Sequence, residues 1–302
     1  MRNLRPVQHA LDRPSSRARV GGFVALTKPR IIELLLVTTV PTMVVAKRGL
    51  PSAWLILATV VGGTLAAGGA NAINMVVDRD IDALMKRTQN RPLVTGLVAP
   101  TEALTFAIAL EVAAFALLSA TVNVLSAVLA VSATAFYVFV YTLWLKRTSS
   151  SNIVIGGAAG AVPVLVGWAA VTDSLGWAPF VLFAVIFVWT PPHFWALAVK
   201  YRDDYTAANV PMLPSVATMR TTSIRILAYT LILWALTILF IPVASMGVIY
   251  AVAAVVLGAV FTGMAVQLLR TESPATAMRL FSWSITYVML LFGAMALDQL
   301  VH

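Results

Sequence analysis

The sequence contains no cysteine among its 302 residues, which excludes disulfide bonds, thiolate metal sites and a cysteine nucleophile. Charged side chains are also scarce, at 11% of residues, whereas a soluble domain carries roughly 25%. Hydrophobic residues make up 60% of the chain, and the mean hydropathy is +0.90. These proportions exclude an ordinary soluble domain and indicate an integral membrane protein.

Long apolar runs account for most of the chain. Nine runs of about 20 residues, the length that crosses roughly 30 Å of hydrocarbon, centre near residues 38, 65, 112, 134, 162, 189, 234, 258 and 290. Because lipid offers the backbone no hydrogen-bond partners, apolar runs of this length must form helices and not a barrel. We therefore predict an all-α integral membrane protein with nine transmembrane helices.

Acidic residues are few, with 12 Asp and Glu against 21 Lys and Arg. If the N-terminus lies in the cytoplasm, 19 of the 21 basic residues fall on the inner side, and only Lys47 and Arg48 fall outside. Orientation thus explains the net charge of +9, and no nucleic-acid partner is needed. We predict a cytoplasmic N-terminus and a C-terminus outside.

The first 20 residues form a polar cytoplasmic tail that is rich in arginine. Its composition weakly resembles a mitochondrial transit segment, but a basic tail follows equally from the predicted orientation. We therefore favour a bacterial inner membrane over the mitochondrial inner membrane, with residues 21–302 as a single membrane domain.

An internal repeat is suggested at an offset of 122 residues. This shift places Asn71 on His193, Asp78 on Lys200, and Asp82 on Asp204, and it also aligns Pro41 with Pro163 and Pro92 with Pro214. Such matches at helix breaks and polar positions are typical of membrane proteins with repeated halves. The offset predicts two four-helix halves, approximately residues 21–147 and 148–270, and a ninth helix at 278–300. One site between the halves, on the cytoplasmic side, would use both polar clusters.

The first polar cluster follows the second apolar run. Asn71, Asn74, Asp78 and Asp82 share one stripe of a helix, while Asp80 points the opposite way. Amide and carboxylate oxygens suit Mg²⁺, which also binds substrate phosphates. The bases that follow, Lys86, Arg87 and Arg91, suit a diphosphate. The alternative is a loop of solvated charges, but two of these amides lie inside the apolar run, where polar groups are costly.

The second polar cluster repeats this spacing with His193, Lys200 and Asp204, and Asp203 lies at its edge. The Pro191–Pro192 pair predicts a broken or kinked helix beside it. His193 is either a structural residue or a contact to substrate or iron. Three further residues have two interpretations: Lys28 and Arg30 as interface anchors or anion ligands, and Tyr141 as packing or as a ring that stabilises a cation.

Several segments together resemble a known family. The N-x-x-x-D-x-x-x-D pattern of Asn74, Asp78 and Asp82 resembles the UbiA superfamily of intramembrane prenyltransferases. "TKPR", "DALMKRTQNRPL", "TPPHFWALA" and "YRDDYTAANVPMLP" are similar to its protoheme IX farnesyltransferase branch. This resemblance implies nine helices around a central cavity, and transfer of the farnesyl group of farnesyl diphosphate to a vinyl group of haem b, with water added to give haem O. A haem A synthase or a terminal oxidase would use the product.

The resemblance also implies roles for individual residues. The implied catalytic set is Asn74, Asp78, Asp82, Lys200 and Asp204, of which all but Lys200 would hold Mg²⁺. The implied substrate contacts are Asn71, Lys86, Arg87, Arg91, Lys28, Arg30, His193, Asp203 and Tyr141. The chain departs from the superfamily pattern where Lys200-x-x-x-Asp204 replaces a second D-x-x-x-D. Lys200 would then bind diphosphate or a haem propionate, and Asp204 would bind metal or orient Lys200.

Other functions share some of these features. A prenyltransferase that acts on a quinone precursor would have the same metal stripe, and only the segments around His193 and Lys200 would differ. A transporter would also have repeats and intramembrane polar residues, but its site normally lies near the midplane. A haem-handling membrane protein without enzymatic activity would not need the Mg²⁺-type stripe.

Overall fold

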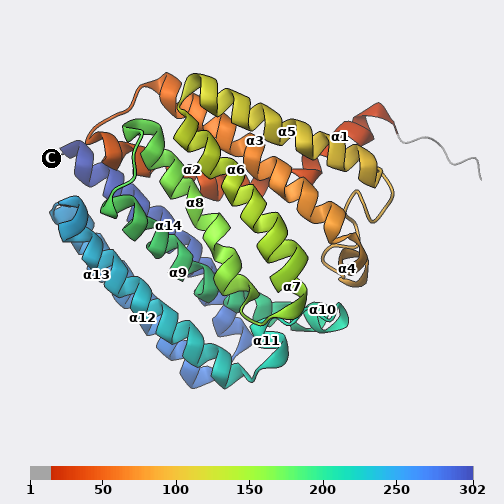
Figure 1. The fold of residues 1–302 in the computed structure, drawn as a ribbon. Helices are drawn as coiled ribbons and strands as arrows, with labels where there is room; N and C mark the ends of the chain where they lie inside the picture. The colour runs from red at the N-terminus through yellow and green to blue at the C-terminus, as the bar shows by residue number, and fades with distance from the viewer. Residues whose placement is uncertain (1–14, 302) are drawn as a thin grey trace, which may run out of the picture.

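The computed structural model describes residues 15–301, apart from the side chains of residues 30–36, and helices joined by loops make up this part of the chain (Figure 1). No strand occurs in this described part. The helices are α1 Ser16–Leu26, α2 Pro29–Lys47, α3 Ala53–Val77, α4 Arg79–Leu84, α5 Pro100–Thr121, α6 Val124–Ala135, the π-helix η1 Phe136–Leu145, α7 Lys146–Thr148, α8 Asn152–Thr172, α9 Trp177–Lys200, α10 Arg202–Ala207, α11 Leu213–Val216, α12 Met219–Ala244, α13 Val248–Thr271 and α14 Pro274–Val301.

The long helices confirm the predicted membrane architecture. Within residues 15–301, eight helical segments are long and apolar enough to cross a membrane, and they coincide with eight of the nine predicted runs. The remaining run, near residue 38, corresponds to α2, which is not among these eight. The fold class is therefore confirmed, whereas the count of nine stays a prediction.

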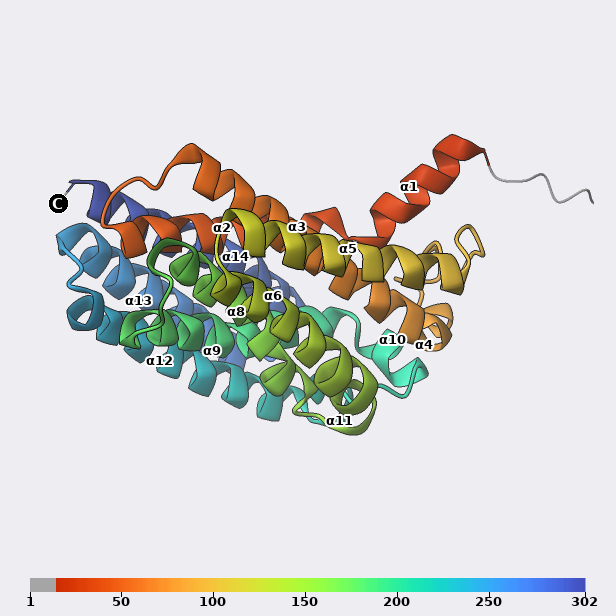
Figure 2. The ribbon, with the colours of Figure 1, turned by 45° about the horizontal axis from the view of Figure 1, so that its top comes forward.

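The long helices pack side by side in one body (Figure 2). One group consists of α9, α12, α13 and α14, and it holds most of the largest hydrophobic core. A second group consists of α3, α5, α6 and α8. The two groups meet where α8 packs on α9, and α2 contacts both α8 and α14. Large apolar side chains such as Trp54, Phe139 and Trp177 remain exposed on the outside, as expected for surfaces that face lipid.

Side chains fix how the helices meet at their ends. Asn123 caps α6 by accepting the Ser126 N–H at 2.8 Å, and its amide donates to the Ala169 carbonyl of α8 at 2.7 Å. At the same end of the molecule, Asp298 of α14 accepts the Gly247 N–H at 2.6 Å beside the start of α13. These polar ties hold one end of the bundle together, and the loops with α4 and α10 form the other end (Figure 1).

Candidate functional site

A cavity of about 410 Å³ lies among helices of both groups. Its walls come from α2, α3, α6, η1, α8 and α9, together with the loops near α4 and α10. Polar and charged side chains gather in one part of the lining: Lys28, Asn71, Asn74, Asp82, Arg87, Arg91 and Lys146. Most of the remaining lining is apolar or carries threonine. The cavity thus suits a ligand with an anionic head and a long apolar body.

The end of α3 carries the first predicted stripe, but the helix stops earlier than predicted. It ends at Val77, and Asp78 is the junction to the short helix α4. The backbone bonds Asp78 N–H to Asn74 O at 2.9 Å and Asp82 N–H to Asp78 O at 2.8 Å keep the helical direction through this junction. Asn74, Asp78 and Asp82 therefore stay near one another despite the interruption.

A hydrogen-bonded network joins the buried members of the stripe. The Asn74 amide donates to Asp78 Oδ2 at 2.6 Å and to Thr142 Oγ1 of η1 at 3.2 Å. Lys146 forms an ion pair with the same oxygen of Asp78. Asp78 is fully buried, and its other oxygen, Oδ1, accepts no hydrogen bond. Asp78 is not among the residues that line the cavity, whereas Asn74 and Lys146 are.

Two further bases face the stripe. Arg91 donates to Asp82 Oδ2 at 2.5 Å, and Lys28 donates to Asn74 Oδ1 at 2.9 Å. Lys28 precedes α2, and burial lowers its pKa to about 7, with a further contribution from the positive charges of Arg91 and Lys146. Asn71 donates to the Thr27 carbonyl at 3.2 Å, which holds the α1–α2 junction against α3. The polar part of the cavity is thus crowded with cations.

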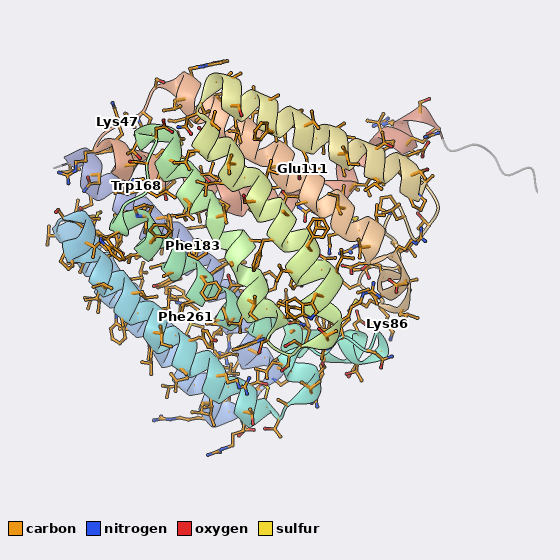
Figure 3. All side chains as sticks on the ribbon, in the orientation of Figure 1. Lys47, Lys86, Glu111, Trp168, Phe183 and Phe261 are labelled. Carbon is orange, nitrogen blue, oxygen red and sulfur yellow. The ribbon has the colours of Figure 1, made fainter. Side chains whose placement is uncertain are left out.

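Charges on the outer side of this junction do not face the cavity. Asp80 has a 60% exposed side chain and receives two 2.7 Å hydrogen bonds from Arg147, which hold its pKa at about 2. Lys86 is exposed at the same end of the molecule (Figure 3). Asp80 points away from the cavity-lining stripe, as predicted. Lys86, in contrast to the prediction, does not line the cavity.

The π-helix η1 supplies the aromatic wall. Its wider turns are seen where the Lys146 N–H bonds to the Tyr141 carbonyl, five residues back, and such helices frequently occur at functional sites. Tyr137 and Tyr141 stack with ring centroids 5.3 Å apart, and both line the cavity. Gly156 of α8 leaves the space for the Tyr141 ring, because a Cβ there would overlap it.

The second predicted cluster lies beside a lining residue of the cavity rather than in its wall. The Arg87 N–H donates to Asp204 Oδ2 at 3.2 Å, so the loop after α4 is bonded to α10. The Tyr201 ring lies between Arg87 and Lys200, 5.3 Å and 5.4 Å from their charged ends. Lys200, Asp203 and Asp204 do not line the cavity, and the first two are exposed.

His193 faces α14 and not the cavity. Its Nδ1 lies 2.7 Å from Ser284 Oγ, and its ring stacks on Trp189 with centroids 4.3 Å apart. This geometry favours the structural interpretation of His193. Of the predicted break or kink at Pro191 and Pro192, the break is wrong, because α9 runs continuously from Trp177 to Lys200, as membrane helices can when neighbouring groups bond the freed carbonyls. The kink stays a prediction.

The structure therefore assembles part of the predicted set. Asn71, Asn74, Asp82, Arg87, Arg91, Lys28 and Tyr141 line one cavity. The side chain of Arg30 lies outside the described residues. The structure adds four further residues to the site: Lys146, Tyr137, Thr142 and Tyr205. Lys146 pairs with Asp78, and it could have been found from its position at the end of a predicted helix, on the side where the carboxylates cluster.

The stripe offers the oxygen ligands that a hard cation prefers. Asn74 and Asp82 line the cavity, and behind Asn74 the buried Asp78 has a carboxylate oxygen, Oδ1, without a hydrogen-bond partner. Among the described residues, no group of three His, Cys, Asp or Glu side chains could hold a metal by itself. The donor set thus fits Mg²⁺ held by two carboxylates and an amide, with phosphate oxygens completing its coordination.

An apolar intramembrane cavity with amides, carboxylates and bases at one end defines the class of protein. The chain belongs to the UbiA prenyltransferase family, whose model matches residues 35–292. Among its relatives, the protoheme IX farnesyltransferase of Parafrankia sp. (strain EAN1pec) is 55% identical over 295 residues, which cover 96% of this chain and 93% of the relative.

Solved structures share the fold at low identity. An apo UbiA homologue from Aeropyrum pernix K1 superposes with a TM-score of 0.72 at 18% identity, covering 90% of this chain and 98% of the homologue. A UbiA homologue from Archaeoglobus fulgidus, bound to GPP and Mg²⁺, gives a TM-score of 0.60 at 15% identity, with 91% and 99% covered. The chain is thus a multi-pass membrane protein with the UbiA fold.

Proposed function

We propose that this protein transfers the farnesyl group of farnesyl diphosphate to a vinyl group of haem b and adds water, which gives haem O and diphosphate. The observation that carries the proposal is the single cavity that joins a cationic, carboxylate-bearing end to an apolar body. Relatives named protoheme IX farnesyltransferase, three of which are 54–56% identical to this chain, support haem as the acceptor.

The polar end would bind the diphosphate. Asn74, Asp78 and Asp82 would hold Mg²⁺, which neutralises charge on the departing diphosphate when it is bound. Arg91, Lys28 and Lys146 already contact this stripe and line the cavity, so they can donate to diphosphate oxygens from several sides. A bound anion would also favour the charged form of Lys28, whose pKa is lowered by burial and by the nearby cations.

The chain's other residues would act on the allylic group. When the bond between C1 and the diphosphate oxygen breaks, the electron pair leaves with the diphosphate, and positive charge develops on the allylic carbons. The stacked rings of Tyr137 and Tyr141 line the cavity and can stabilise that charge through their faces. The vinyl electrons of haem then form the new carbon–carbon bond, and water adds to the resulting cation and releases one proton to give the hydroxyl group. The apolar lining keeps water from the first cation.

The second polar cluster would act around the mouth. Asp204 fixes the backbone of Arg87, a residue that lines the cavity, so Asp204 can contribute to diphosphate or metal binding through this loop. Lys200, Asp203 and Lys86 are exposed nearby, where they could meet the haem propionates or the diphosphate on entry. His193 would support the Trp189 ring, which is part of the cavity wall.

We also propose that the polar cavity end faces the cytoplasm of a bacterial cell. Lys47 and Lys86 lie at opposite ends of the bundle (Figure 3), and the bases near α4, α7 and α10 outnumber those near Lys47. By the positive-inside rule the α4 end is then cytoplasmic. We further propose that the chain consists of two four-helix halves. Its product would be delivered to a haem A synthase or a terminal oxidase.

The test is product formation by the detergent-purified protein. We would incubate it with haem b, farnesyl diphosphate and Mg²⁺, with and without a chelator, and measure haem O by mass spectrometry. Asp82→Asn should abolish the chelator-sensitive product, whereas the control Asp80→Asn, which changes an exposed carboxylate two residues away, should retain it. Prenylation of a hydroxybenzoate or naphthoate in place of haem would refute haem as the acceptor, but it would leave membership of the prenyltransferase family intact.

A further inference from the structure

Helix α8 contains several glycines, and close packing explains why three of them carry no side chain. A Cβ at Gly156 would overlap the Tyr141 ring, one at Gly157 would lie 2.9 Å from Thr190 Cβ, and one at Gly167 would lie 2.7 Å from the Thr39 carbonyl oxygen. At these positions only glycine permits the close approach of the neighbouring helix or side chain.

Close packing does not explain the glycine at position 160. A Cβ built there meets no atom within 4 Å, yet Gly160 lines the cavity. Gly160 is exposed, and at 3.6 residues per turn it lies about 20° from Gly167 and about 140° from Ile155, so it shares the face of α8 on which Gly156 and Gly157 line the cavity. Glycine inside a helix is destabilising relative to alanine. The side chain is thus missing where protein packing would allow one.

The position of Gly160 along the cavity shows what its space can serve. Gly156 is level with Tyr141, whose neighbour Thr142 bonds Asn74 at the polar end. Gly160 lies about 6 Å further along α8, and the cavity continues beyond it to Val166. An apolar chain whose diphosphate is bound at the polar end must pass Gly160 to fill the rest of the cavity.

We propose that Gly160 determines the length of the prenyl donor, because its missing side chain keeps the channel open beyond the first isoprenoid units. This inference deepens the proposed function and rests on it for the diphosphate end of the cavity. A large side chain at position 160 would project into the channel, so a donor as long as farnesyl diphosphate would no longer fit. A shorter donor, such as dimethylallyl diphosphate, would still bind by its head.

The experiment measures donor binding without haem. Wild type, Gly160→Ala, Gly160→Leu and Gly160→Phe would be titrated with dimethylallyl, geranyl and farnesyl diphosphates and with inorganic diphosphate, all in the presence of Mg²⁺. Gly263 of α13 supplies the control Gly263→Phe, because a Cβ there also meets nothing within 4 Å and the residue does not line the cavity.

We expect farnesyl diphosphate affinity to fall by about tenfold or more in Gly160→Phe, less in the smaller variants and not in Gly263→Phe. Inorganic and dimethylallyl diphosphate should keep wild-type affinity, which also shows that the variant is folded. Equal losses for all donors, or no loss for farnesyl diphosphate, would overturn the inference. Haem O formation is measured separately, so failure of the haem assignment leaves the donor comparison intact.

Discussion

Lys146 and Arg147 are adjacent in the chain, but the ion pair of Lys146 is buried and that of Arg147 is exposed. Substituting each residue therefore compares the cost of losing a buried ion pair with that of losing an exposed one. Lys146 pairs with Asp78, and the two side chains are 14% and 0% exposed. Arg147 pairs chiefly with Asp80, and those side chains are 34% and 60% exposed. Breaking a buried pair by removing one partner costs about 3–5 kcal/mol, because the remaining charge is buried without compensation.

Arg147 limits that loss, because it stays 3.8 Å from Asp78 Oδ1 after Lys146 is removed. We therefore expect Lys146→Ala to lower the free energy of unfolding by about 2–3 kcal/mol. For a chain of this size the corresponding fall in Tm is roughly 3–5 °C. Arg147→Ala removes an exposed pair and should change the free energy of unfolding by about 1 kcal/mol or less.

Thermal unfolding of both variants in detergent, followed by size-exclusion chromatography, measures the difference. The KM for farnesyl diphosphate should also rise more in Lys146→Ala, because Lys146 lines the cavity and Arg147 does not. Equal falls in Tm for the two variants would refute the assignment of Asp78 as a buried charge that depends on Lys146.

Three further variants test other parts of the structure. Asp298→Ala should lower the free energy of unfolding by about 2–3 kcal/mol, because the buried carboxylate accepts three backbone N–H bonds beside the start of α13; a wild-type Tm would contradict this. Gly156→Val should displace the Tyr141 ring and slow farnesyl transfer by about tenfold or more, and an unchanged rate would show that the ring's position is unimportant. Asn74→Ala should raise the Mg²⁺ concentration for half-maximal turnover by roughly tenfold or more, which a Mg²⁺ titration of activity measures.

The membrane architecture was predictable because the hydropathy pattern that identifies a spanning helix is local. The runs near residues 65 and 290 need no knowledge of their neighbours, and both are helices in the structure. The polar stripe of Asn71, Asn74 and Asp82 was predictable for the same reason, since helical periodicity fixes which residues share a face.

Contacts between distant segments were not predictable. Nothing local shows that Lys146 reaches Asp78, because the pair depends on how η1 packs beside α3. The same holds for Arg87 and Asp204, whose bond joins the loop after α4 to α10, 117 residues apart in the chain. His193 shows the same limit, because its spacing matches Asn71 and left both a structural role and a substrate contact open, whereas the packing of α14 supplies Ser284 as its partner.

The π-helix makes the register of the chain between Phe136 and Leu145 functionally significant. Hydropathy places little constraint on the number of residues in this segment, since a membrane helix shorter by one residue still crosses the bilayer. A wide turn holds one residue more than an ordinary turn, so deleting one residue between Tyr137 and Tyr141 would allow ordinary helical turns without a large rotation of the residues that follow. Lys146 would then stay near Asp78, but the stacked pair of rings would lose its four-residue spacing. A deletion that preserves membrane insertion would therefore be expected to disrupt the aromatic wall of the cavity, which places an insertion–deletion constraint on this helix.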